Sequence, residues 1–96
     1  MIITQVRFHL SAPISLEDAT AKFRSTAPKY EGHPGLIRKC YVRSEDGQTV
    51  GAFYFWETRA AAEATYTDAW KAMVTETYGA APDITFYDSP VQVENT

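Results

Sequence analysis

The sequence has little of what metal, redox and disulfide chemistry require. Its 96 residues include one cysteine, Cys40, and two histidines, His9 and His33, which lie far apart along the chain. A single cysteine cannot form an internal disulfide, and this spacing matches no recognisable zinc or iron motif. The sequence therefore predicts no metal site, and the use of one cysteine favours the reducing cytoplasm.

Clusters of positive charge, long apolar runs and phosphate-binding motifs are also missing. Nine basic residues stand against 12 acidic ones, for a net charge of −3, and no group of Lys and Arg marks a nucleic-acid surface. No segment has the pattern of a signal peptide or the length of a membrane span. Neither a G-x-G-x-x-G motif nor a P-loop is present. We therefore expect no nucleic-acid or membrane partner and no nucleotide or flavin cofactor.

Hydrophobic residues, in contrast, make up 45% of the chain, and aromatic residues make up 14%. A chain of this length and composition forms one small domain, residues 1–96, with a single core. Domains of this size bury only a modest fraction of their surface, so association with a second copy is a way to bury more.

The first part of the chain predicts a strand followed by a helix. Residues 2–10 alternate between apolar and polar side chains, as a half-buried strand does. Ser15, with Asp18 three positions later, is typical of a helix N-cap. The helical spacing of apolar residues then continues to about Ala27.

Residues 36–44 and 49–57 predict two strands of a hairpin. Asp46-Gly47 between them favours a two-residue turn of type I′, which would fix the register of the pair. The expected pairs are Val42 with Gly51, Cys40 with Phe53, Arg38 with Phe55, Tyr41 with Ala52, Lys39 with Tyr54, and Ile37 with Trp56.

A second helix and a last strand complete the domain. Thr58 is the expected N-cap of the helix, and Gly79 is its expected end. The β-branched Thr65 and Thr67 predict a weak point or bend midway. Residues 83–94 predict the last strand. The order β-α-β-β-α-β indicates an α+β, ferredoxin-like fold, in which two helices cover one face of a four-stranded antiparallel sheet.

Both faces of the predicted hairpin are apolar, although the helices can cover only one of them. The more uniformly apolar face, which we expect to meet the helices, carries Leu36, Cys40, Val42, Phe53 and Phe55. The other face carries Ile37, Lys39, Tyr41, Val50, Ala52, Tyr54 and Trp56, joined by Gln5, Arg7 and His9. Soluble monomers rarely expose such a large aromatic patch. We therefore predict a homodimer with two-fold symmetry that covers it.

Nearly the whole chain, from Ile2 to Val93, resembles a known family. The stretches that carry the resemblance are "PGLIRKCYV", "GAFYFWET", "RAAAEA" and the "YG" before the last strand. They are similar to the YdhR-like mono-oxygenases of the dimeric α+β barrel superfamily. More distantly, they are similar to the antibiotic-biosynthesis mono-oxygenases, which oxidise polyaromatic phenols without metal, flavin or haem. The resemblance implies a dimeric barrel and a cofactor-independent mono-oxygenase acting on a small aromatic or polyketide-like substrate.

One departure from the distant relatives concerns the end of the second hairpin strand. Trp56 matches a tryptophan of the antibiotic-biosynthesis branch, but Ala52 stands where that branch tends to have asparagine. Superfamily members also include isomerases and cyclases. A non-catalytic ligand-binding dimer and an isomerase or cyclase therefore remain alternative functions.

Oxygenation without a cofactor requires an activated substrate, because the substrate anion itself must react with oxygen. The protein then needs a base, a cation to hold the anion and a dry pocket. His9 is the candidate base, since the ordinary pKa of histidine lies near neutrality. Lys39 and Arg7 are the candidate cations, with ion pairing or anchoring at the dimer interface as their alternative role.

Aromatic residues on the same predicted face supply the walls of a pocket. We expect Tyr41, Tyr54 and Trp56 to stack against an aromatic substrate. Tyrosine and tryptophan are equally common at protein interfaces, so packing in the dimer is the competing interpretation.

Overall fold

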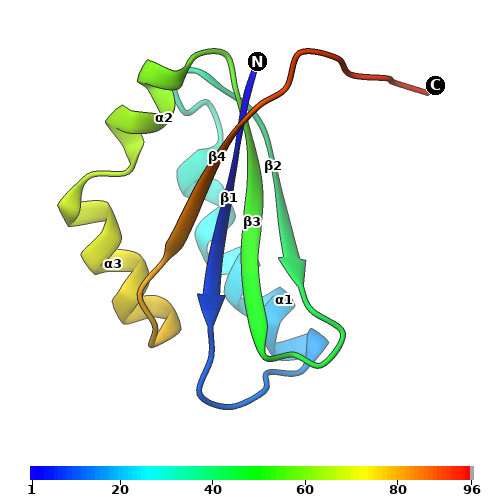
Figure 1. Ribbon diagram of the computed structural model, residues 1–96. Coiled ribbons are helices and arrows are strands. Elements are labelled where there is room, and N and C mark those ends of the chain that lie inside the picture. The colour runs from blue at the N-terminus through cyan, green and yellow to red at the C-terminus, as the bar shows by residue number, and fades with distance from the viewer. Residues whose placement is uncertain (96) are drawn as a thin grey trace.

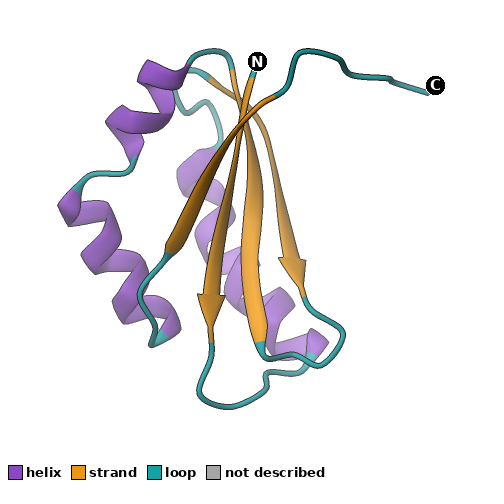
Figure 2. Ribbon diagram, viewed as in Figure 1, coloured by secondary structure: helices purple, strands orange, loops and turns teal. Residues whose placement is uncertain are grey.

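The computed structural model describes residues 1–95 and has the predicted element order (Figure 1). Its four strands form one antiparallel sheet in the order β2-β3-β1-β4. All helices lie on one side of this sheet, and its other face is uncovered (Figure 2). The ferredoxin-like α+β fold is therefore confirmed. The elements are β1 (Ile2–His9), α1 (Leu16–Thr26), the 3₁₀ helix η1 (Ala27–Tyr30), β2 (Leu36–Arg43), β3 (Thr49–Trp56), α2 (Arg59–Thr65), α3 (Asp68–Tyr78) and β4 (Asp83–Asp88).

Side-chain caps begin the helices where the sequence places them. The Ser15 hydroxyl accepts a hydrogen bond from the Asp18 backbone N–H at 3.1 Å, and Thr58 caps α2 in the same way. The predicted bend is a complete break, because α2 ends at Thr65 and Thr67 caps a new helix, α3. Gly79 ends α3 with a φ of +71°.

The hairpin has the predicted register over most of its length but a different turn. Five of the predicted pairs are confirmed, whereas Trp56 pairs with Leu36 because a bulge displaces Ile37. The predicted type I′ turn is wrong, since that turn needs a positive φ at both central residues. In residues 1–95 only glycines have a positive φ, and here Gly47, at +72°, follows a turn closed by its N–H and the Ser44 carbonyl.

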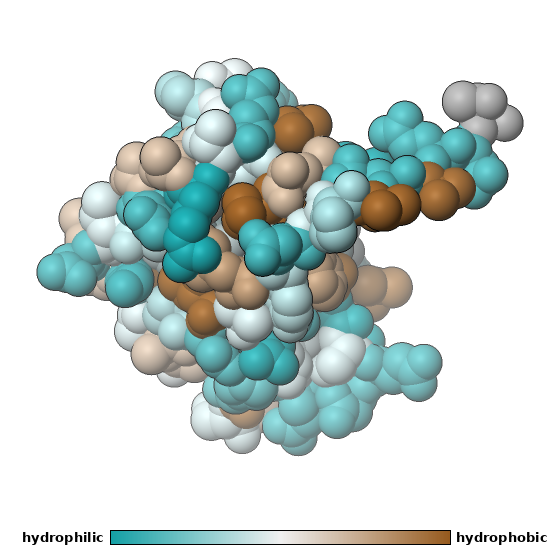
Figure 3. Space-filling model, turned by 45° about the horizontal axis from the view of Figure 1, so that its top comes forward, coloured by the Kyte–Doolittle hydropathy of each residue, from teal (hydrophilic) through white to brown (hydrophobic). Residues whose placement is uncertain are grey.

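The last strand is shorter than predicted, since β4 ends at Asp88. Residues 89–95 form an arm that projects from the body of the molecule, with apolar side chains among hydrophilic ones (Figure 3). Val91 and Val93 on this arm are 78% and 82% exposed.

The pairing of β1 with β3 decides which side chains meet the helices. Residues that lie opposite one another in antiparallel strands share a face of the sheet. Six such residues are at most 4% exposed and belong to the core: Thr4, Val6 and Phe8 of β1, opposite Tyr54, Ala52 and Val50 of β3. Trp56, with no exposed surface, continues this face.

The predicted assignment of the two faces is therefore wrong. Cys40, Val42, Phe53 and Phe55 lie on the uncovered face, and only Leu36 packs on the core, because the bulge at Ile37 turns it inward. No short turn fixes the register between β1 and β3, and a shift of one residue exchanges the faces. The sequence pattern could not decide between them because β3 is apolar on both sides.

A buried hydroxyl links β1, β3 and the junction between α2 and α3 at one end of the core. The Thr4 hydroxyl accepts a hydrogen bond from the Trp56 indole N–H at 2.9 Å and lies 2.6 Å from the Tyr66 hydroxyl. Thr4 itself has no exposed surface. The hydroxyl thus satisfies two polar groups that water cannot reach.

We expect Thr4→Val to lower the free energy of unfolding by about 1–3 kcal/mol, because the Trp56 N–H loses its partner while the side-chain volume is kept. Thr85→Val on the uncovered face is the matched control and should change stability little. Urea unfolding followed by tryptophan fluorescence measures both. Equal stability of the two variants would contradict the assignment of Thr4 to the helix-covered face.

Candidate functional site

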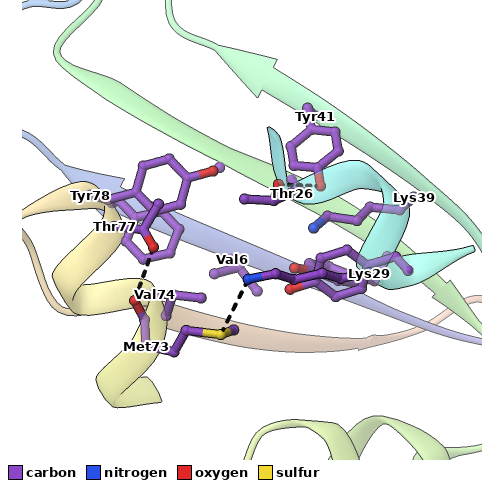
Figure 4. A pocket seen from close by; sticks show the side chains of 14 residues that line it. Val6, Thr26, Lys29, Lys39, Tyr41, Met73, Val74, Thr77 and Tyr78 are labelled. Atoms are coloured by element: carbon purple, nitrogen blue, oxygen red, sulfur yellow. Dashed lines mark hydrogen bonds between the residues drawn. The ribbon is translucent and has the colours of Figure 1, made fainter. Parts of the chain in front are cut away.

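A cavity lies between the sheet and the helices, on the covered face (Figure 4). Strands β1, β2 and β3 form its floor, while the end of α1, η1 and α3 form its sides. Its lining is mostly aromatic and aliphatic, with two lysines and two threonines. The lining residues are Val6, Phe8, Thr26, Lys29, Tyr30, Lys39, Tyr41, Gly51, Ala52, Tyr54, Met73, Val74, Thr77 and Tyr78.

The mouth of the cavity is closed by two long side chains from opposite sides. Lys29 of η1 donates a hydrogen bond to the Met73 sulfur of α3 at 3.6 Å (Figure 4). The enclosed volume is about 20 Å³, room for about one water molecule. The whole hollow, including the space at its mouth that is open to solvent, is about 420 Å³. Both closing side chains are unbranched and lie at the surface. Flexible side chains of this kind can move aside and widen the mouth without a change in the sheet.

Lys39 is the charged group inside this cavity. It projects from β2 with its amine directed toward the middle of the cavity (Figure 4). Its Nζ lies 3.4 Å from the ring centroid of Tyr30, 4.1 Å from that of Tyr41 and 4.6 Å from that of Tyr54. None of the Asp and Glu residues in the described part of the chain forms an ion pair with it. We call Lys39 with Tyr30, Tyr41 and Tyr54 the tyrosine cage.

Two effects act on the Lys39 amine in opposite directions. Burial lowers the pKa of Lys39 from 10.5 to about 7, because the ammonium loses its hydration. The ring faces stabilise the ammonium through cation–π attraction, worth about 0.5–2 kcal/mol. Removing an ion from water costs several kcal/mol, so desolvation is the larger effect and the pKa of Lys39 stays below its usual range.

The rings of the tyrosine cage are held by neighbouring groups. The Tyr41 hydroxyl lies 2.7 Å from the Thr26 hydroxyl, and Tyr30 accepts a hydrogen bond from the Trp70 indole at 3.1 Å. Burial raises the pKa of the Tyr54 hydroxyl far above its ordinary value. Burial also raises the pKa of the Tyr41 hydroxyl, so at neutral pH the hydroxyls of Tyr41 and Tyr54 are uncharged.

The structure brings together only some of the predicted site residues. Lys39, Tyr41 and Tyr54 line the cavity, as one group on one face. Trp56 lies beside Tyr54, with parallel rings 5.7 Å apart, but is fully buried in the core and does not line the cavity.

Arg7 and His9 lie on the opposite, uncovered face of the sheet. Arg7 forms an ion pair with Asp83 of β4 at 2.9 Å, and His9 Nε2 lies 3.7 Å from the same carboxylate. The prediction that these two residues share a face with Lys39 is wrong, because Val6 and not Arg7 lies opposite Ala52 in the pairing of β1 with β3.

Several cavity residues were not expected from the sequence. Tyr30 and Lys29 lie in η1, which has four residues. A segment of this length is too short for its apolar spacing to predict which side is buried. Tyr78 stacks on Phe8 with ring centroids 4.3 Å apart, and burial raises its pKa to about 12. The one sequence signal for Tyr78 was its position at the end of the second predicted helix, just before Gly79. At that position its ring reaches Phe8 of β1.

Within residues 1–95, no three His, Cys, Asp or Glu side chains come close enough to hold a metal ion. The helices in the same range are too short and too polar to cross a membrane.

The fold and the cavity define a ferredoxin-like α+β protein with a cavity lined by aromatic side chains between sheet and helices. Residues 3–87 match the family described as "Putative mono-oxygenase ydhR", and the chain belongs to this family. This confirms the resemblance inferred from the sequence. No curated protein matches the chain in sequence.

Solved structures share the fold at low sequence identity. The mono-oxygenase from the gene ActVA-Orf6 of Streptomyces coelicolor, in complex with nanaomycin D, is 17% identical with a TM-score of 0.72, over 99% of this chain and 92% of that one. SnoaB, a cofactor-independent oxygenase from Streptomyces nogalater, is 14% identical with a TM-score of 0.68, over 98% and 97%. A putative antibiotic biosynthesis monooxygenase from Deinococcus radiodurans is 12% identical with a TM-score of 0.70, over 100% and 99%.

The lowered pKa of Lys39 gives folding a defined pH dependence. In the folded protein this pKa is about 7, against 10.5 for an unburied lysine, so between these values the unfolded chain binds more protons. The free energy of unfolding therefore rises with pH across this window. Below pH 7 the amine is protonated in both the folded and the unfolded chain, so this rise is absent. We expect Lys39→Met to remove this rise, while Lys71→Met on the surface of α3 keeps it. Urea unfolding at pH 6, 8 and 9.5 measures the slope, and equal slopes for wild type and Lys39→Met would contradict the burial of the amine.

Proposed function

We propose that this protein is a cofactor-independent mono-oxygenase that acts on a small aromatic phenol or polyketide-like substrate in the cavity around Lys39. The observation that carries this proposal is an amine with a pKa of about 7 in an aromatic cavity without a carboxylate partner in the described residues. Membership of the mono-oxygenase family and the likeness to an oxygenase that needs no cofactor support it.

The tyrosine cage supplies what such a reaction needs from the protein. The neutral amine of Lys39 accepts the proton of a bound phenol or enol, and the ammonium that results holds the substrate anion. The anion then gives electrons to dioxygen. One oxygen atom enters the substrate as a carbonyl, and the other leaves as water with the two hydrogens removed. The rings of Tyr30 and Tyr54 stack on the substrate and exclude water.

A non-catalytic ligand-binding role is the second candidate, and Ala52 favours it. Ala52 lies in the floor of the cavity, where the antibiotic-biosynthesis branch tends to have an asparagine amide. Without that amide, Lys39 and the tyrosine hydroxyls are the polar groups nearest to a ligand on this side of the sheet. An isomerase or cyclase would use the same amine as its base.

A homodimer is the second part of the proposal, formed through the uncovered face of the sheet. This face carries half-buried apolar side chains in the central strands, and Val42 and Tyr87 on the edge strands are 37% and 45% exposed. Its apolar members are Ile3, Cys40, Val42, Phe53, Phe55 and Tyr87. A second copy, packed sheet to sheet, would remove them from water. The dimer would thus use the face opposite to the cavity.

We expect the protein to consume oxygen with an anthrone or a hydroxynaphthol as substrate, and Lys39→Met to lower the rate by about a hundredfold, as loss of a general base does. Lys71→Met and His9→Gln, which lie outside the cavity, should keep the rate. An oxygen electrode with product analysis by chromatography measures the reaction. Substrate-dependent quenching of tryptophan fluorescence without oxygen uptake would support the ligand-binding alternative instead.

We expect a dimer in sedimentation equilibrium across a wide concentration range, and a monomer for Phe53→Glu, because the new charge would be buried in the interface. Leu16→Glu on the outer surface of α1, where Leu16 is 66% exposed, is the matched control and should remain a dimer. Circular dichroism checks that both variants fold. A folded Phe53→Glu dimer would place the interface elsewhere.

A further inference from the structure

We infer that Lys39 is also a nucleophilic amine that forms an imine with aldehydes and ketones of flat, apolar molecules. This activity is distinct from oxygenation and needs no oxygen. It rests on the geometry of the tyrosine cage: an amine directed into a cavity, stacking faces around it, and no anion in the described residues to hold it as an ion pair.

The surroundings of Lys39 differ from those of the other lysines in the chain. Lys22 donates its amine hydrogen to the Thr77 carbonyl, Lys29 is bonded to Met73 at the surface, and Lys71 is exposed on α3. In residues 1–95 the Lys39 amine has no such bond, so its lone pair is available once the proton is lost. A lysine desolvated in an apolar pocket is one of the known ways in which proteins activate an amine.

Among the residues that the structure describes, the ionisable groups that line the cavity with Lys39 include no carboxylate. They come from every element around the cavity: Lys29 and Tyr30 from η1, Tyr41 from β2, Tyr54 from β3 and Tyr78 from α3. Lys29 is a like charge, and the pKa values of Tyr41, Tyr54 and Tyr78 are raised by burial, so these hydroxyls carry no charge near neutral pH. Burial lowers the pKa of Lys39 to about 7, which leaves a large fraction of the amine neutral in that range.

The chemical step is balanced without a further reagent. The nitrogen lone pair attacks the carbonyl carbon, a carbon–nitrogen bond forms, and the carbonyl oxygen becomes a hydroxyl. The carbon–oxygen bond then breaks, and the oxygen leaves as water with the two hydrogens of the amine. Hydrolysis of the imine reverses the step.

The choice of carbonyl compound follows from the walls of the cavity. The rings of Tyr30 and Tyr54, which pack edge to face with centroids 5.9 Å apart beside the amine, favour a planar aromatic group through offset or edge-to-face contacts. A small charged aldehyde gains nothing from these walls. Lys29 and Met73 close the mouth of the cavity, so movement of these side chains gives a ligand a way to the amine.

Reductive trapping tests the inference. The protein is incubated without oxygen with naphthaldehyde and sodium cyanoborohydride between pH 6 and pH 10, and the adduct is located by mass spectrometry of peptides. We expect Lys39 to be the one lysine labelled, with half-maximal labelling near pH 7, as its pKa requires; the peptide map separates this adduct from that of the N-terminal α-amine, a group that reacts in the same pH range. At pH 7 an amine with the reference lysine pKa near 10.4 has about a thousandfold less neutral form than an amine with a pKa of 7, so labelling of the other lysines should be far slower.

Two comparisons make the result decisive. Lys39→Arg keeps a cation in the cage and should abolish the adduct, while Met73→Ala opens the mouth and should speed the labelling of Lys39. Labelling of Lys22, Lys29 or Lys71 as fast as Lys39, or no label on Lys39, would overturn the inference. The peptide map of the wild-type protein decides this even where a variant fails to fold. Because the experiment excludes oxygen, its outcome is independent of the proposed oxygenation.

Discussion

The register between β1 and β3 is the constraint on which the rest of the structure depends. Opposing residues of antiparallel strands share a face, so the pairing of Val6 with Ala52 sends Tyr54 and its β2 neighbour Lys39 toward the helices. The same pairing sends Arg7 to the other side. Gly51 protects this arrangement, because a Cβ at its position would lie 1.9 Å from the Val6 carbonyl oxygen. A shift of one residue would place Lys39 on the uncovered face and remove the cavity's one interior cation from it.

Placing a lysine on the covered face of a small domain has an energetic cost that the tyrosine cage offsets only in part. Ring faces at 3.4–4.6 Å attract the ammonium, but they replace neither its hydration nor a carboxylate partner. An apolar residue would pack there with less strain. Retention of such a group in a cavity, where its pKa moves toward neutrality, is typical of functional sites rather than of structural ones. Both functional proposals use this property of one residue.

The sequence predicted features that depend on neighbours along the chain and missed those that depend on distant pairing. The caps at Ser15 and Thr58, the break near Thr65 and most of the β2–β3 register are set within a few residues, so their signals are complete in the sequence. The face of β3 that meets the helices is set by β1, more than 40 residues earlier, and no local pattern records it. Lys39, Tyr41 and Tyr54 were found because they alternate on two adjacent strands. Tyr30 and Tyr78 were missed because a short 3₁₀ helix and a helix end bring them to the cavity.

The cavity and the proposed dimer interface lie on opposite faces of the sheet. The predicted arrangement asked one face to serve as both pocket and dimer interface, so the same aromatic side chains would have had two competing roles. In the structure the tyrosine cage is assembled from β2, β3 and η1 of one chain, beneath its own helices. The half-buried apolar side chains of the uncovered face, such as Phe53 and Phe55, lie on the other side of the sheet. A partner packed there would reach the cage only through the sheet itself, by restraining the strands that carry Lys39 and Tyr54. Association would thus act on the site by stiffening its floor and not by supplying a wall.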